Sequence, residues 1–407
     1  MNNLEIKTAR SVPELESLRE AWLTWDGHRD SDIDMVLNVL DSYPEAKRPH
    51  VIALYKDGEL DAILIGRLDE RVYHFKVGYL SVFRPRARCL TFVYGAIRGN
   101  ASEENVEIFV EEVLKSLKAG EADMALMEFV PVESALYQFS LKMPGFLSRD
   151  VRPPLQKHDV MQIPGNIDEV YRRMSSDRRI ELRRKVRKLD KHPAGLAKIV
   201  CYRNESDLDQ LFRDAEEVAK KTYQRGLGVG FVDTPVVRKR LQLGARKAWL
   251  RAYILYIGNQ PVAFWVGMLY HGTFVAEYMG YDRAYRSYSP GMVLMMRMIG
   301  CFCGGATGDD VRELDFGLGH AEYKAVLCTK VWSEAAVFIF SPTPKGVLLK
   351  LERLLTRTGD GLARRALSSV KFFDKLKRLW RDRLARRAAA SAGSSSPDGT
   401  LAPTDSN

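Results

Sequence analysis

Apolar and polar positions alternate along this chain in patterns that predict strands and helices in turn. Two apolar runs joined by Asp57-Gly58 predict a hairpin, because Asp-Gly is a favoured two-residue turn. Ser102 precedes apolar residues spaced three and four apart, which predicts a capped amphipathic helix. The elements expected over residues 1–150 are a helix from Pro13, a hairpin over 51–68, strands over 72–83 and 88–97, a helix from Ser102, a strand over 123–130 and a short helix over 133–143.

The second part of the chain repeats this order of elements. The expected elements are helices over 205–222 and 234–247, a hairpin over 249–270, a strand over 273–281, a helix over 290–303, a strand over 311–316, a helix from about 320 and a strand over 331–340. The shared order indicates an internal duplication. We therefore predict an α/β fold with two tandem domains, each a mixed, mostly antiparallel sheet flanked by helices.

Composition sets the expected boundaries. Pro153-Pro154 disfavours regular structure and indicates a linker, and the pattern changes again after Pro342. The Ser/Gly/Pro-rich end of the chain is expected to be disordered. The expected division is a domain over 1–150, a linker over 151–158, a domain over 159–342, a basic amphipathic helical tail over 343–390 and a disordered segment over 391–407.

The composition is that of an ordinary globular protein, with 46% hydrophobic and 28% charged residues among 407. No apolar run reaches the roughly 18 residues of a membrane-spanning helix, and the first residues lack the apolar core of a signal peptide. Five scattered cysteines favour reduced thiols in the cytoplasm. Cys301 and Cys303 lack a cluster of His or Cys partners, so we expect no metal site there.

The net charge of +10 is concentrated in two stretches. Residues 172–191 hold 10 Lys/Arg and 3 Asp/Glu, a net +7. Ser175 is expected to cap a helix here, with arginines outward and Leu182 on the inner side. A basic helix of this kind is compatible with a solvated face, with contact to cofactor phosphates or an anionic glycan, or with an RNA backbone. Aromatic residues do not interleave the arginines, which weighs against single-stranded RNA.

The tail is the second basic stretch, with 13 Lys/Arg and 6 Asp/Glu over 346–407, again net +7. Its helix has two interpretations. It packs on the body of the protein, or its Phe372, Phe373 and Trp380 lie at an anionic membrane surface or a protein partner while Lys and Arg face the headgroups.

A helix start is the strongest candidate for a binding site. The turn before the helix over 290–303 contains small residues, and Pro290 pre-sets the first helical turn. Unpaired N–H groups and the positive end of the helix dipole make such a start an anion site. The alternative interpretation of this helix start is an ordinary helix cap that binds no ligand. The expected contacts come from the N–H groups of Tyr288, Ser289, Gly291 and Met292 and from the side chain of Arg286.

Three motifs carry a resemblance to a known family: SSDRRIELRRKVRKL (175–189), YDRAYRSYSPGMVL (281–294) and LDFGLGHAEYK (314–324). They resemble the GNAT acyltransferase superfamily, in its CelD-like branch found with bacterial cellulose and exopolysaccharide genes, related to the FemAB-type aminoacyl transferases. The second glycine of the usual turn is Val293 here. IRGNASEENV (97–106) lacks the glycine-led helix start, so the first domain resembles a degenerate copy of the same fold.

The resemblance implies acetyl-CoA or another acyl-CoA as co-substrate and no metal. In the family, pantetheine lies where two strands splay, and a strand N–H, here near 279–281, stabilises the oxyanion. Glu277, a carboxylate within a strand, is a candidate general base, as is His320, which titrates near neutrality. Tyr323 stands where the family often places the tyrosine that protonates the thiolate, and Lys324 is a candidate contact for a phosphate. Packing or solvation is the alternative role for each of these residues.

The expected function is acyl-CoA-dependent transfer of an acetyl or acyl group to an amine or hydroxyl of a small molecule or saccharide, in polysaccharide biosynthesis. The first alternative is a Fem-like transferase that takes an aminoacyl group from tRNA. The second is a non-catalytic scaffold of a polysaccharide-biosynthesis complex. A cytoplasmic location, peripheral at the inner membrane surface through the tail, accompanies these expectations.

Overall fold

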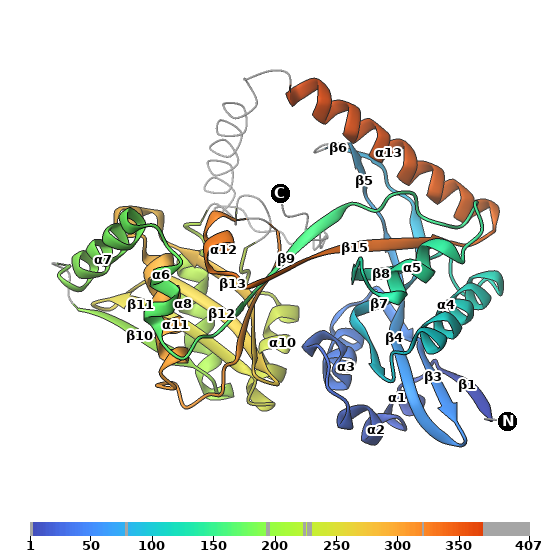
Figure 1. Cartoon of the computed structure of the whole chain (residues 1–407), viewed down its shortest axis with the longest axis horizontal. Helices are drawn as coiled ribbons and strands as arrows, with labels where there is room; N and C mark the ends of the chain where they lie inside the picture. The colour runs from blue at the N-terminus through green and yellow to red at the C-terminus, as the bar shows by residue number, and fades with distance from the viewer. Residues whose placement is uncertain are drawn as a thin grey trace. The chain divides into compact units, whose positions relative to one another are not determined.

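The computed structural model describes residues 3–77, 80–192, 196–222, 225, 230–319 and 321–368 (Figure 1). The chain forms two compact units. The first unit comprises the described residues through Gln156 together with those from Ser333 onward, and the second unit spans Lys157–Trp332. None of the helices in the described ranges is long and apolar enough to cross a bilayer.

The first unit is a mixed sheet with helices packed against it. The strand order is β1-β3-β4-β7-β8-β15, with β2 paired to β4, and β7 and β8 are parallel. The elements are β1 (Leu4–Ala9), α1 (Val12–Glu16), α2 (Arg19–Thr24), η1 (Arg29–Ser31), α3 (Ile33–Ser42), β2 (Ala46–Pro49), β3 (Val51–Lys56), β4 (Glu59–Val72), β5 (Phe75–Val77), β6 (Leu80–Phe83), β7 (Arg86–Gly99), α4 (Glu103–Lys118), β8 (Met124–Pro131), α5 (Ala135–Lys142), β15 (Lys330–Phe340) and α13 (Pro344–Ser368).

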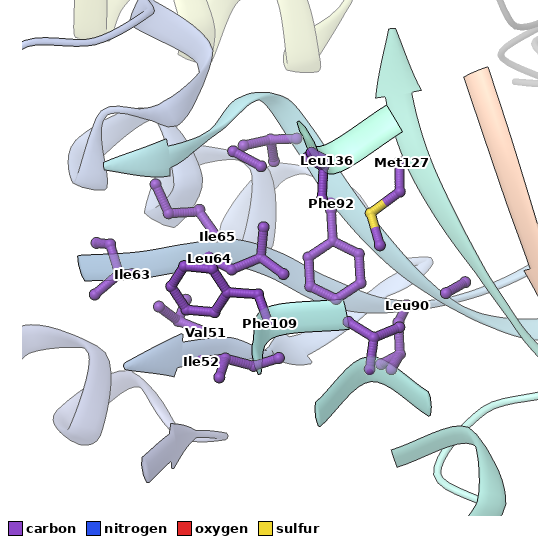
Figure 2. Packing of buried hydrophobic residues seen from close by; sticks show 14 of the residues in the cluster. Val51, Ile52, Ile63, Leu64, Ile65, Leu90, Phe92, Phe109, Met127 and Leu136 are labelled. Atoms are coloured by element: carbon purple, nitrogen blue, oxygen red, sulfur yellow. The ribbon is translucent and has the colours of Figure 1, made fainter. Parts of the chain in front are cut away.

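The core of the first unit lies between the sheet and α4. Figure 2 shows Ile63 and Ile65 of β4 in one buried cluster with Phe92 of β7 and Phe109 of α4. Phe92 and Phe109 are fully buried. Removing each such ring from water stabilises the fold by a few kcal/mol, so α4 is held by its apolar stripe, as its periodicity predicts.

A buried histidine makes the first unit sensitive to acid. His50 is fully buried, and its Nδ1 lies 3.7 Å from Glu121 Oε2, while Arg10 and Arg48 pair with the same carboxylate at 2.7 and 2.8 Å. Burial lowers the pKa of His50 to about 4. Hydrogen bonding from Arg10 lowers the pKa of Glu121 to about 2. Both groups therefore resist protonation in the folded state.

We expect the free energy of unfolding to fall as the pH drops from about 6.5 to 4, because unfolded His50 binds a proton that the folded state refuses. The slope reaches about 1.4 kcal/mol per pH unit for one such group. Glu121 adds a further loss of stability at lower pH: its lowered pKa stabilises the fold fully above the unfolded value of 4.5, and this contribution is lost as the pH falls toward about 2. Urea unfolding across this range should show a flatter slope in His50→Gln; an unchanged slope would rule out His50 as the source.

The second unit repeats the architecture. Its strand order is β9-β14-β13-β12-β11-β10, antiparallel except for β13 and β14. The elements are β9 (Leu155–Gln162), α6 (Ile167–Arg172), α7 (Ser176–Asp190), β10 (Ala197–Tyr202), η2 (Glu205–Asp207), α8 (Leu208–Ala219), α10 (Pro235–Arg246), β11 (Leu250–Ile257), β12 (Gln260–Tyr270), β13 (Thr273–Tyr281), η3 (Arg283–Tyr288), α11 (Pro290–Cys303), β14 (Glu313–Leu318) and α12 (Glu322–Leu327).

Helices cover both faces of this sheet. Phe264 and Trp265 are neighbours on β12 and point to opposite faces. On the first face Phe264 meets Phe231, whose ring also contacts Phe212 of α8. On the other face Trp265 packs on Phe274, whose ring contacts α11. Every residue of β11 is buried, which explains its continuous apolar run.

The predicted α/β class with mixed sheets flanked by helices is confirmed. Three local predictions were wrong. The strand expected over 72–83 is instead the end of β4 followed by the antiparallel pair of β5 and β6. The helix from Pro13 is divided into α1 and α2. The expected linker over 151–158 contains the start of β9, because Pro153-Pro154 ends before the strand begins.

The strand expected over 331–340 is present as β15, but it belongs to a different domain from the one expected. This strand, β15, pairs with β8 of the first unit, from Glu334 with Pro131 to Phe340 with Met124. The first unit therefore includes chain that the expected boundary at 342 gives to the second domain. The described part of the tail is α13; Phe372, Phe373, Trp380 and residues 391–407 lie outside the described residues.

Candidate functional site

The two parallel strands of the second unit diverge. β13 and β14 pair only from Thr273 with Glu313 to Val275 with Asp315. Beyond these pairs β13 continues to Tyr281 and β14 to Leu318. The splay expected between these strands is therefore present, because the β13–β14 ladder ends at Val275, before residues 279–281.

A β-bulge lies on β13 at this splay. Val266 pairs with Tyr278 but Gly267 pairs with Ala276, so Glu277 is the extra residue. Glycine is needed at position 267, because a Cβ there would lie 2.5 Å from the carbonyl oxygen of Val275. The bulge turns a strand residue away from the regular alternation of faces and fixes where its side chain points.

The carboxylate of Glu277 points toward α10. It lies 2.9 Å from the guanidinium of Arg240, and its side chain is 5% exposed. Arg240 also donates to the hydroxyl of Tyr278 at 2.5 Å, and the ring of Tyr278 packs on Phe231 on the α8 face. Glu277 is thus a buried, ion-paired carboxylate on the α8 and α10 side of β13.

The start of α11 has the features of an anion site. Pro290 is its first residue, and Ser289 before it has a left-handed backbone, φ 49° and ψ 53°, with no capping bond from its side chain. The N–H groups of Gly291 and Met292 have no acceptor within the helix, because the first intrahelical bond is made by Val293. The first turn has no acidic residue.

Ser289 was predicted to offer its backbone N–H to the anion, but this geometry gives the N–H another acceptor. Its N–H donates to the carbonyl of Arg286 at 3.0 Å, so this amide is already occupied. Arg286 lies exposed on η3, before the helix. Tyr288 packs edge-on against His192 at 5.1 Å, with the ammonium of Lys188 4.6 Å from its ring centre. Tyr288 thus joins η3 to the last turn of α7.

A cavity of about 220 Å³ opens beside this helix start. α7 forms one wall, and its basic residues Arg178 and Lys185 face the opening together with Glu181, which pairs with Lys185 at 2.7 Å. The inner stripe of α7 is buried through Leu182 and Leu189, as its periodicity predicts. The cavity is lined by Met174, Arg178, Glu181, Leu182, Lys185, Ser289, Met292, Tyr323, Val326 and Leu327.

Tyr323 reaches the cavity from α12. Its hydroxyl donates to Met279 Sδ at 3.4 Å, and its ring packs edge-on against Phe316 at 5.9 Å. Tyr323 therefore connects the diverging ends of β13 and β14. It lies next to the segment 279–281, whose backbone is the predicted oxyanion donor. The other residue predicted at this turn, His320, lies outside the described residues.

Lys324 has a different environment from the one expected. Its ammonium donates to the carbonyls of Phe316, Leu318 and Gly319 at 2.9 to 3.0 Å. Burial lowers the pKa of Lys324, and the carboxylates of Asp159 and Asp315 act in the opposite direction. The ammonium holds the turn after β14 and does not line the cavity, so we do not include it among the cofactor contacts.

Sequence inspection missed a buried pair beside this turn. His158 Nε2 lies 2.7 Å from Asp315 Oδ1, and the His158 ring stacks on Trp332 at 4.5 Å. Asp315 Oδ1 also accepts from the N–H of Gly317 at 2.6 Å. The only signal in the sequence was His158 next to Asp159, at the end of a segment that resembled a linker.

The corresponding helix start in the first unit differs. The hydroxyl of Ser102 accepts from the N–H of Asn105, and Glu103 and Glu104 occupy the first turn of α4. A filled cap and two carboxylates oppose an anionic ligand. Of these two helix starts, the start of α11 is therefore the one with the features of an anion site. Within the described ranges, no three His, Cys, Asp or Glu side chains gather to hold a metal ion.

Comparison with known proteins finds a family model and solved structures that resemble parts of this chain. Residues 176–325 match the family model of the acetyltransferase (GNAT) domain. A search of curated proteins finds no significant match. The structure of FemX has 12% sequence identity and a TM-score of 0.54, covering 85% of this chain and 100% of that one. A tandem GNAT protein from the clavulanic acid biosynthesis pathway has 10% identity and a TM-score of 0.46, covering 84% and 99%.

Proposed function

We propose that the second unit transfers an acyl group from a coenzyme A thioester to an amine or hydroxyl. The observation that carries this proposal is the start of α11, which offers the N–H groups of Gly291 and Met292 beside the splay of β13 and β14. The match of 176–325 to an acetyltransferase (GNAT) domain supports it. The CelD-like branch and a saccharide acceptor in polysaccharide biosynthesis are finer parts of the same proposal.

The residues present fit an anionic cofactor. Gly291 and Met292 would bind the pyrophosphate through backbone N–H groups at the positive end of the helix. Arg178 and Lys185, across the cavity on α7, would add positive charge near the phosphates. This gives the basic stretch over 172–191 a role at the donor site. The pantetheine arm would occupy the gap between the diverging strands.

Acyl transfer requires an oxyanion donor and two proton movements. The acceptor nitrogen or oxygen attacks the thioester carbonyl, and a backbone N–H within 279–281 would stabilise the developing negative charge. The Tyr323 hydroxyl would give its proton to the departing thiolate. Glu277 would take the acceptor's proton through a water molecule, from the α10 side, where its carboxylate pairs with Arg240.

We expect Tyr323→Phe to lower the rate of acyl-CoA consumption by about 10²-fold, because general acids contribute on the order of 10² to 10⁴. The dissociation constant of the donor should change little, since the ring remains. Release of free thiol from acetyl-CoA, with water as the acceptor, measures this rate. Tyr43→Phe in the first unit is the matched control. Equal rates for Tyr323→Phe and the wild type would remove Tyr323 from the mechanism.

A second candidate donor is aminoacyl-tRNA. α7 carries Arg183, Arg184 and Arg187 exposed to solvent, next to residues that line the cavity. Cations at the entrance suit an RNA backbone as well as a nucleotide cofactor. Transfer activity that requires charged tRNA and is abolished by ribonuclease would favour this donor, whereas activity with acyl-CoA in ribonuclease-treated protein would exclude it.

A further inference from the structure

The outer side of α13 and a loop of the first unit form an exposed apolar surface with a basic edge, here called the α13 surface. Its loop residues are Phe146, Leu147 and Val151, which are 72%, 56% and 41% exposed. Its helix residues are Leu348, Leu351, Leu354 and Leu355, which are 40% to 54% exposed.

The opposite side of α13 packs on the first unit, so the helix that carries the α13 surface is firmly attached. Leu349 and Thr356 are buried, and the ammonium of Lys345 lies 2.7 Å from Asp123. Arg353 pairs with Asp150 at 3.0 Å. A Cβ at Gly346 would lie 2.2 Å from the Ser341 carbonyl oxygen, so glycine permits a close approach of the helix start. In Figure 1, α13 runs beside β5 of the same unit.

The exposed leucines follow the helix period. Leu348, Leu351 and Leu355 are spaced by three and four residues, so they share one stripe, about opposite the buried stripe. The loop lies beside Leu354, because Val151 and Leu354 line the same small hollow, and Leu354 neighbours Leu351 at a spacing of three residues. Large apolar side chains that cluster on a solvent-exposed face indicate a docking surface, whereas single exposed leucines do not.

Cations border the α13 surface where the helix meets the loop. The ammonium of Lys350 lies 4.7 Å from the ring centre of Phe146 and donates to its carbonyl. Arg149 lies 5.7 Å from the same ring, and Arg357 donates to the carbonyl of Val151 at 2.8 Å. The one carboxylate in this hollow, Asp150, is paired with arginines. The border therefore has a net positive charge.

We infer that the α13 surface docks on a bilayer that contains anionic phospholipids. Phe146 and the leucines would enter the boundary between headgroups and acyl chains, and Lys350, Arg149 and Arg357 would meet the phosphates. Charge complementarity selects this occupant, because an apolar stripe bordered by cations and an exposed aromatic ring matches a lipid surface. The surface lies wholly in the first unit, so this inference does not depend on the acyl donor.

Vesicle sedimentation with the full chain tests the inference. The protein should bind phosphatidylcholine vesicles that contain about one-third phosphatidylglycerol and bind pure phosphatidylcholine at least 10-fold more weakly. Leu351→Glu and Phe146→Glu should each lower binding to the anionic vesicles about 10-fold or more. Leu23→Glu on α2, at a leucine that is 50% exposed, is the matched control and should bind as the wild type does.

Thermal unfolding should be similar in all variants, because each changed side chain is exposed. Absence of binding to the anionic vesicles would overturn the inference. Equal binding by Leu351→Glu, Phe146→Glu and the wild type would also overturn it, since another part of the chain would then hold the membrane. A dimer in solution that Leu351→Glu dissociates, without vesicle binding by the wild type, would make the surface a protein interface instead.

Discussion

Gly291→Glu will weaken the binding of acetyl-CoA by about 100-fold or more. Two N–H groups at the start of α11 would each contribute a charge-assisted hydrogen bond to a phosphate, worth about 1.5 to 3 kcal/mol. A carboxylate in this turn opposes the phosphate by repulsion and cancels the favourable end of the helix dipole. Because 1.4 kcal/mol corresponds to about tenfold in affinity, losing one such contact and adding repulsion gives this magnitude.

Gly291→Ala is the control for this prediction. A Cβ at position 291 would lie 3.4 Å from the Tyr281 ring, which is an ordinary contact, so alanine fits without rearrangement. Alanine also keeps the backbone N–H. Calorimetric titration should therefore give a dissociation constant within about threefold of the wild type for Gly291→Ala. Binding by Gly291→Glu that equals binding by Gly291→Ala would show that the phosphates lie elsewhere.

Lys324→Met will lower the free energy of unfolding by about 3 to 5 kcal/mol. The change removes four hydrogen bonds that the ammonium of Lys324, a residue that is 6% exposed, donates to backbone carbonyls. It leaves the carbonyls of Phe316, Leu318 and Gly319 without their donor, and each buried, unsatisfied group costs about 1 to 3 kcal/mol. The same turn precedes Tyr323, so the rate of acyl transfer should fall together with stability.

Lys330→Met provides the matched control for the lysine change. Lys330 pairs with Glu313 at 2.6 Å, but its side chain is 47% exposed. An exposed ion pair contributes at most about 1 kcal/mol, so this variant should unfold close to the wild type. Urea unfolding compares the two variants. A loss for Lys324→Met that matches the loss for Lys330→Met would mean that the carbonyls find water and that the ammonium does not hold the turn.

Local patterns predicted the elements well where their causes are local. The hairpin at Asp57-Gly58 forms because both residues adopt positive φ, 51° and 87°, which this dipeptide tolerates. α11 was predicted as Pro290–Cys303, because a proline begins it and an apolar run continues it. The start of α11 was therefore the part of the site that the sequence predicted most directly.

Features that depend on distant partners were not predictable from the pattern. β15 has the apolar spacing of any strand, and only its pairing with β8, some two hundred positions earlier, assigns it to the first unit. His158 meets Asp315 across 157 positions because β9 pairs with β14. The bulge at Glu277 depends on Gly267 in the neighbouring strand. Periodicity reports which face a residue occupies, but not which strand lies beside it.

The two units illustrate how small changes at a helix start alter binding chemistry. Both place a helix between two parallel strands, β7 and β8 or β13 and β14. At α4 a serine side chain caps the helix, and two glutamates offset the positive end of its dipole. At α11 no side chain caps the helix, and cations of α7 line the adjacent cavity.

A crystal structure with acetyl-CoA tests the central claim most directly. The account predicts the pyrophosphate within hydrogen-bond distance of the N–H groups of Gly291 and Met292. It also predicts the thioester in the gap between β13 and β14, near Tyr323. Acetyl-CoA bound at the start of α4 in the first unit, or on another surface with the start of α11 left without the pyrophosphate, would contradict the account.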